Sequence, residues 1–192
     1  IPYTMENANI NVVVPVDSIT LNKTSTELWT GDTEKLTVTY NPEDASGKTV
    51  TWESDNNAVA TVSPDGTITA VGKGTATITA KTSNAKEDKC EVIVKQPVTG
   101  ISLNKNTLEL EKGETETLTA TVLPGNADGD KTVTWSSSNN DVATVENGVV
   151  TAIGKGSATI TAKTANGIEA KCSVTVGVPL KGISFKDNVT EK

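Results

Sequence analysis

The chain contains no histidine, and its printed sequence shows no arginine, so all 17 of its basic residues are lysines. Histidine is the commonest general base and metal ligand near neutral pH, and arginine supplies the bidentate fork that grips phosphate. Aromatic residues are nearly as scarce, with three tryptophans, two tyrosines and one phenylalanine in 192 residues. These absences disfavour an enzyme, and we expect no catalytic residue, no cofactor and no bound metal in the chain.

The charge and the lack of long apolar runs exclude two classes of partner. The net charge is −7 and the acidic residues are spread along the chain, which disfavours nucleic acid and anionic membranes. The longest apolar stretch, Val12–Val16, is too short for a membrane-spanning helix or a signal peptide, so we expect no membrane insertion in this segment. The first residue is Ile1 and not methionine, and the chain is therefore expected to be a piece of a longer protein.

What the sequence does have is an internal repeat. The motif at Val16–Asn22 returns at Val98–Asn104 and again at Leu180–Phe185, each time after 82 residues. A period of this length predicts tandem domains, as in stalks, fibres and adhesins. The expected divisions are residues 1–15 as an amino-terminal arm or the last strand of a preceding domain, 16–96 and 97–178 as two whole domains, and 179–192 as the first strand of a truncated third repeat.

Within each repeat apolar and polar residues alternate, which is typical of strands half buried on one face of a sheet. Turn-forming residues separate the alternating segments about every ten residues. In the first repeat the expected strands lie at 19–21, 36–40, 50–52, 59–62, 68–70, 76–80 and 90–94. Seven or so short strands predict an all-β chain of tandem Greek-key β-sandwiches.

The two cysteines occupy equivalent positions in the two repeats, so no disulfide can form within one domain. Cys90 and Cys172 each alternate with valines on one strand face, which predicts buried thiols that serve as small hydrophobic core residues. No histidine is available to activate either thiol as a nucleophile. A disulfide between two molecules remains the alternative.

The tryptophans divide into two kinds. Trp52 and Trp135 are repeat-equivalent and lie on the inward parity of their strands, so both are expected in the structural core. Trp29 corresponds to Glu111 and is expected to face outward, as a surface contact with a neighbouring domain or with the amino-terminal arm. One exposed aromatic ring is a poor sugar platform, because such sites stack a ligand on several rings.

Two further motifs are interpreted as turns. The Gly72–Gly74 segment contains a lysine, but a phosphate-binding loop needs four residues between its glycines and a serine or threonine after the lysine. Asn126, Asp128 and Asp130 are spaced like the start of a calcium loop, yet no glutamate closes the site. A solvated turn is the interpretation there, and a calcium site is the alternative.

A longer pattern carries a family resemblance. The first repeat reads ITLN, then LTVTYNPEDA, then VTWESDNNAVATVSPDGTITAVGKGTATITAKT and CEVIV, and the second repeat follows the same scheme. The chain resembles tandem bacterial immunoglobulin-like domains of group 2 (BIG2). The resemblance implies immunoglobulin-like sandwiches without a shared active site. It also implies an exposed setting, in bacterial surface proteins such as adhesins related to intimin and invasin, or in phage structural proteins.

The function expected from repeat and resemblance together is structural. The chain would form a semi-rigid, non-enzymatic spacer in an adhesin-like protein that is secreted or exposed on the bacterial surface. Its partners would be other domains of the same longer chain, with a host-surface protein or a glycan as further candidates. Two alternatives stay open: an appendage of a phage tail or capsid protein in the virion, and an accessory module on an enzyme that binds a glycan, a host protein or calcium.

Overall fold

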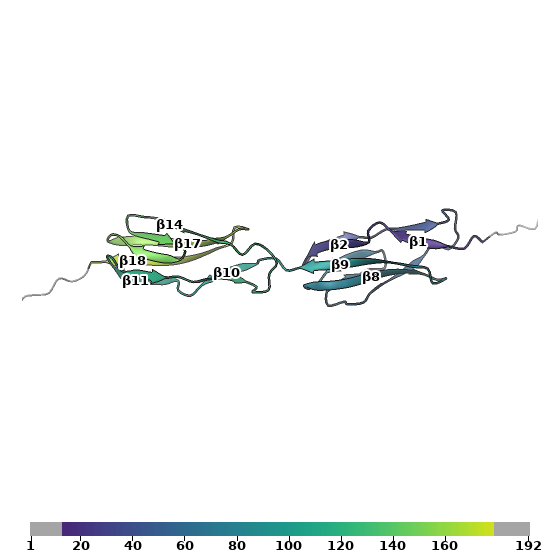
Figure 1. Ribbon diagram of the computed structural model, residues 1–192, viewed down its shortest axis with the longest axis horizontal. Helices are drawn as coiled ribbons and strands as arrows, with labels where there is room; N and C mark the ends of the chain where they lie inside the picture. The colour runs from purple at the N-terminus through teal and green to yellow at the C-terminus, as the bar shows by residue number, and fades with distance from the viewer. Residues whose placement is uncertain (1–12, 179–192) are drawn as a thin grey trace, which may run out of the picture. The chain divides into compact units, whose positions relative to one another are not determined.

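The computed structural model describes residues 13–178 and shows only strands, turns and bends there (Figure 1). The chain divides into two compact units between Gln96 and Pro97, called unit 1 and unit 2 below. The prediction of an all-β chain is confirmed. The predicted strand at 179–192 and nearly all of the predicted arm at 1–15 lie outside the described residues.

Unit 1 is a sandwich of two sheets. Its strands are β1 (Ser18–Leu21), β2 (Ser25–Trp29), β3 (Thr33–Lys35), β4 (Val38–Asn41), β5 (Val50–Ser54), β6 (Ala60–Val62), β7 (Thr67–Ala70), β8 (Gly74–Thr82) and β9 (Glu87–Lys95). One sheet has the order β2-β9-β8-β5, and the facing layer consists of the sheet β3-β7-β6 and the pair β1-β4. The chain crosses between the layers several times, for example from β1 to β2 and from β4 to β5, so the core is built from residues far apart in the sequence.

Unit 2 repeats this arrangement. Its strands are β10 (Gly100–Leu103), β11 (Thr107–Glu111), β12 (Thr115–Thr117), β13 (Ala120–Leu123), β14 (Val133–Ser137), β15 (Ala143–Glu146), β16 (Val149–Ala152), β17 (Gly156–Thr164) and β18 (Glu169–Gly177). The sheet orders β11-β18-β17-β14, β12-β16-β15 and β10-β13 correspond strand by strand to those of unit 1. The sequence repeat is therefore a repeat of the whole fold.

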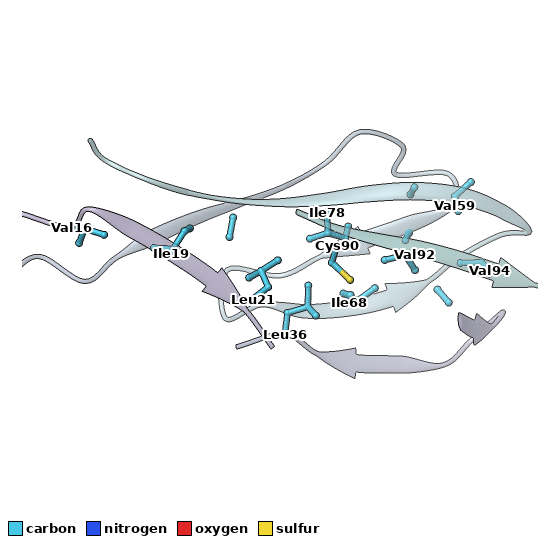
Figure 2. Close-up of a cluster of buried hydrophobic side chains, with 14 of the residues drawn as sticks. Val16, Ile19, Leu21, Leu36, Val59, Ile68, Ile78, Cys90, Val92 and Val94 are labelled. Carbon is cyan, nitrogen blue, oxygen red and sulfur yellow. The ribbon is translucent and has the colours of Figure 1, made fainter. Parts of the chain in front are cut away.

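The alternation of residue types decides which face of each strand is buried. In β8 the side chains of Ala76, Ile78 and Ala80 are buried, while the intervening threonines point outward. Threonine is β-branched and suits an extended strand, so the outer face keeps its strand preference without adding apolar surface. Figure 2 shows the resulting core of unit 1, a layer of small aliphatic side chains that extends from Val16 to Val94.

The structure has more strands than the alternation predicted. The predicted strand at 36–40 is shorter, because the chain changes partner here: β3 pairs with β7, whereas β4 pairs with β1. The segment that becomes β2 was not predicted as a strand at all. It runs parallel to β9, and both inner residues, Thr26 and Leu28, are only partly buried.

Candidate functional site

Unit 1 carries an open groove of about 430 Å³ between its two layers. The groove lies between two edge strands. β4 has a strand partner on one side only, and β5, the edge strand of the other sheet, lies across the groove from β4. Tyr40 of β4 and Trp52 of β5 line this groove, together with Lys35, Lys48 and Asp65. The arrangement offers two aromatic rings within a charged rim.

The two predicted core tryptophans both lie in strands at the edge of a sheet. Trp52 and Trp135 are partly buried and pack against the cores of their units. Both belong to edge strands, β5 and β14, which have a neighbour in their own sheet on one side only. Trp29 is 40% exposed at the end of β2. Its backbone N–H donates to the Asp32 carboxylate at 3.0 Å, which fixes the turn after β2.

Tyr40 is a groove residue that the sequence pattern did not identify. The residue at the equivalent position in unit 2 is Val122, so the second aromatic ring belongs to unit 1 alone. Burial raises the pKa of Tyr40, since a phenolate loses hydration there. The difference between Tyr40 and Val122 was one signal in the sequence that unit 1 has a different surface here, and the differences between Lys35 and Thr117 and between Asp65 and Asn147 were others.

The rim of the groove contains one strongly perturbed carboxylate. Lys35 Nζ lies 2.5 Å from Asp65 Oδ2, and Ser63 and Thr67 also donate hydrogen bonds to Asp65. The Lys35 ammonium, followed by these hydrogen bonds, holds the pKa of Asp65 well below its usual range. Its hydrogen bonds with Ser63 and Thr67 order the β6–β7 turn.

The cysteines lie at equivalent places in the two cores. Cys90 in β9 and Cys172 in β18 are both 0% exposed and both free thiols. Burial raises the pKa of both thiols, since a thiolate would lose its hydration. Two buried thiols with raised pKa values do not form a reactive site.

We therefore expect both cysteines to resist alkylation in the folded protein and to react rapidly in denaturant. Labelling with a maleimide at pH 8, followed by mass spectrometry, should show native rates at least about a hundredfold below the unfolded rates, because reaction requires opening of the core. Free cysteine added to the same reaction serves as the control for reagent activity. Rapid labelling of either residue in the native state would contradict its burial.

The acidic turn that resembled a calcium loop is held by local hydrogen bonds. Asp130 Oδ1 accepts from the backbone N–H of Thr132 at 2.8 Å, and hydrogen bonds from Thr132 hold the pKa of Asp130 below its ordinary value. Within residues 13–178, no three histidine, cysteine or acidic side chains gather closely enough to hold a metal ion. That same part of the chain contains no helix long and apolar enough to cross a membrane.

A polar clasp, made of a buried threonine and an exposed asparagine, recurs in both units. In unit 2 the side chain of Thr164 donates to Asn166 Oδ1 at 2.7 Å, and Asn166 Nδ2 donates to the carbonyl of Val98 at 2.9 Å. In unit 1 Asn84 holds the carbonyl of Val16 in the same way, at 2.7 Å. The clasp attaches the first residues of each unit to the loop between its two longest strands.

The two-sheet fold, the two partly buried tryptophans and the two copies of the clasp agree with a match to a known family. Residues 15–94 and 97–176 each match the family described as bacterial Ig-like domain (group 2). The chain belongs to this family. The resemblance drawn from the sequence motifs is thereby confirmed, and so are the immunoglobulin-like sandwiches that it implied.

Bacterial Ig-like domains similar to this chain occur in proteins of different kinds. The chain is 37% identical over 174 residues to an uncharacterized protein of Clostridium acetobutylicum, covering 88% of this chain and 18% of that protein. It is 33% identical over 171 residues to an Ig-like virion protein of Serratia phage KSP90, covering 85% of this chain and 66% of that protein. It is 50% identical over 85 residues to a kappa-carrageenase of Pseudoalteromonas carrageenovora, covering 44% of this chain and 21% of that protein. The chain thus spans only about a fifth of the Clostridium protein and of the carrageenase.

Proposed function

We propose that the chain is a non-catalytic spacer of a longer, exposed bacterial protein, in which it presents another module at a distance from the surface. The observation that carries this proposal is the duplication of a complete Ig-like sandwich, with a very short connection between the two copies at Gln96 and Pro97, called the join below. Repetition of a stable unit adds length, and a chain of such units needs no site of its own to do so. Secretion or surface exposure and adhesin-like use are parts of the same proposal.

The join supports the proposal because it is short and both of its ends are anchored. β9 ends at Lys95, whose carbonyl accepts from the backbone N–H of Thr30 at 2.9 Å in unit 1. Val98 is buried in unit 2 and held there by the Asn166 clasp. Between these two anchors lie only Gln96 and Pro97, and the ring of proline fixes one of the two soft dihedral angles.

The spacer hypothesis predicts that inserting a flexible segment will loosen the join and leave the units intact. We expect insertion of about ten glycine and serine residues after Gln96 to broaden the distribution of distances between fluorescent labels placed on the two units. The thermal midpoints of both units should change little, because lengthening a loop costs little free energy. The measurement is single-molecule energy transfer on labelled protein with and without the insertion.

The matched control is an insertion of the same segment into the exposed β4–β5 loop of unit 1, after Gly47, outside the join. That variant should keep the narrow distribution of the unmodified chain. An equally broad distribution in the unmodified chain would mean that the units move independently, and the spacer would lose its mechanical basis.

Two alternatives have specific support. The similarity to the Ig-like virion protein extends over 85% of this chain and favours an appendage of a virion, in which the same spacer role would apply. The similarity to the kappa-carrageenase and the groove between Tyr40 and Trp52 favour an accessory module on an enzyme, with a glycan as its ligand. The sequences that flank this chain in its parent protein distinguish the three functions. A cell-wall anchor would indicate the surface spacer, a tail or capsid domain the virion appendage, and a hydrolase domain the accessory module.

A further inference from the structure

The groove of unit 1 contains two polar groups that are available to a ligand. They are the indole N–H of Trp52 and the hydroxyl of Tyr40. Neither group makes a hydrogen bond within residues 13–178, and neither is sealed from solvent. Tryptophan and tyrosine combine an apolar ring with a polar end, so they suit ligands that are apolar on one face and polar at the rim.

The charges on the rim of the groove favour an anionic ligand. Two lysines, Lys35 and Lys48, and one aspartate, Asp65, line the groove, which leaves one net positive charge there in a chain whose net charge is −7. Asp65 already accepts hydrogen bonds from the ammonium of Lys35 and from two hydroxyl groups. Lys48 donates to the carbonyl of Glu43. Because an ammonium has three N–H donors, both lysines keep donors for a ligand.

We propose that unit 1 binds an acidic oligosaccharide, one that carries carboxylate or sulfate groups, in the groove between Tyr40 and Trp52. A sugar ring has a face of C–H groups and a rim of hydroxyls, which matches two aromatic residues bordered by donors. Its acidic group would accept charge-assisted hydrogen bonds from the lysines. The volume of about 430 Å³ is within the range of small-ligand sites. This binding site is additional to the spacer role, and it narrows the glycan of the accessory-module alternative to an acidic one.

Unit 2 shows which residues are particular to this site. It keeps the tryptophan and one of the two lysines, as Trp135 and Lys131. It lacks the tyrosine, the other lysine and the aspartate, so we expect one binding site per chain. The residues that differ, with that of unit 1 first, are Tyr40 and Val122, Lys35 and Thr117, and Asp65 and Asn147.

The three tryptophans of the chain provide three reporters in one experiment. The full chain, labelled with nitrogen-15 in its indole groups, is titrated with a hexamer of galacturonic acid and followed by nuclear magnetic resonance. We expect the indole signal of Trp52 to shift. The signal of Trp135 should stay in place because its unit lacks the tyrosine, and that of Trp29 because it lies on β2, outside the groove. Absence of a shift at Trp52, or equal shifts at all three, would overturn the site.

Three further probes define the class of ligand. A sulfated galactan hexamer should also shift the signal of Trp52, and its affinity relative to the galacturonate shows which anion the groove prefers. A neutral galactan hexamer should bind at least about tenfold more weakly. Salt at about 1 M, where the Debye length is about 3 Å, should weaken the binding of both acidic hexamers. Equal affinity for the neutral hexamer would overturn the acidic assignment, and tighter binding of a glutamate hexapeptide would overturn the saccharide assignment.

Substitutions identify the contributing side chains. Tyr40→Val introduces the residue that unit 2 carries at this place, and it should raise the Kd for the galacturonate hexamer by about tenfold or more, because a contacting ring is lost. Lys48→Gln should weaken binding of the acidic hexamers and leave the neutral one unaffected. Lys131→Gln is the matched control, since it removes the same charge from the equivalent place in unit 2, and it should leave the Kd unchanged.

Transfer of the site to unit 2 tests whether these residues are sufficient. Thr117→Lys, Val122→Tyr and Asn147→Asp, combined in one chain, should make the signal of Trp135 shift with the same hexamer and raise the number of sites from one to two. A variant that keeps its thermal midpoint, but in which the signal of Trp135 does not respond, would overturn the assignment of binding to these residues.

The binding site and the stiff spacer can fail separately. A narrow label distribution across the join, together with no response of Trp52, would keep the spacer and remove the site. A broad distribution with a selective response of Trp52 would keep the site and remove the spacer.

Discussion

Replacing Trp135 by alanine is expected to lower the free energy of unfolding of unit 2 by about 3 kcal/mol, near the lower end of the range for large aromatic core residues. The ring packs against the buried cluster of unit 2 and lies close to the β15–β16 turn, since a Cβ built on Gly148 would come 3.2 Å from Trp135 Cζ2. Its removal leaves a cavity that the short strands around it cannot fill. The partly accessible edge of the ring places the loss below that of a fully enclosed tryptophan.

The matched control for this prediction is Trp29→Ala. Trp29 is 40% exposed on the outward face of β2, so its removal should cost less than about 1 kcal/mol. Urea unfolding followed by the reactivity of Cys172 reports on unit 2, and that of Cys90 reports on unit 1. A larger loss for Trp29→Ala than for Trp135→Ala would mean that the inward and outward faces of these strands are assigned wrongly.

The faces of the longest strands could be predicted from the sequence because the pattern and the structure share a period of two. Every second residue of β9, from Cys90 to Val94, is buried, as the alternation with polar residues indicated. The outward position of Trp29 was predicted in a different way, from its correspondence to the charged Glu111 in the second repeat. When one face of a strand contacts the core and the other contacts water, apolar and polar residues alternate along it, and this alternation shows which face is buried.

The partners of strands could not be predicted in this way. The pairing of β2 with β9 joins residues more than sixty positions apart, and nothing in the alternation of Ser25–Trp29 identifies a parallel neighbour. For the same reason, the partly accessible positions of Trp52 and Trp135 were not predicted. The alternation indicated that their rings point inward, but it did not indicate that β5 and β14 are edge strands.

The groove in unit 1 follows from this limit as well. Tyr40 and Trp52 lie on different sheets, and they line one surface only because β4 and β5 face each other across the open side of the sandwich. The sequence supplied the two aromatic residues. Their proximity depends on the crossing of the chain between sheets, which no local pattern encodes.

A second large effect is expected from Gly148→Ala, which should destabilise unit 2 by about 2–4 kcal/mol. Asn147 and Gly148 form the two-residue connection between β15 and β16, and both have positive φ, 49° and 86°. Hairpin turns of this kind favour glycine at the second position. A Cβ at Gly148 would also lie 2.5 Å from the carbonyl oxygen of Leu118, whose own N–H donates to the Gly148 carbonyl at 2.8 Å.

The control Gly113→Ala separates the two causes of this loss. Gly113 is in the same unit and has a similar φ of 93°, but a Cβ built on it meets nothing within 4 Å. It should therefore show only the cost of the left-handed backbone, about 1 kcal/mol. Urea unfolding monitored through Cys172 measures both variants. The loss of unfolding free energy in Gly148→Ala beyond that in Gly113→Ala is the cost of moving the turn away from Leu118 and the Trp135 ring. Equal losses in the two variants would mean that this contact is loose enough to accept a methyl group.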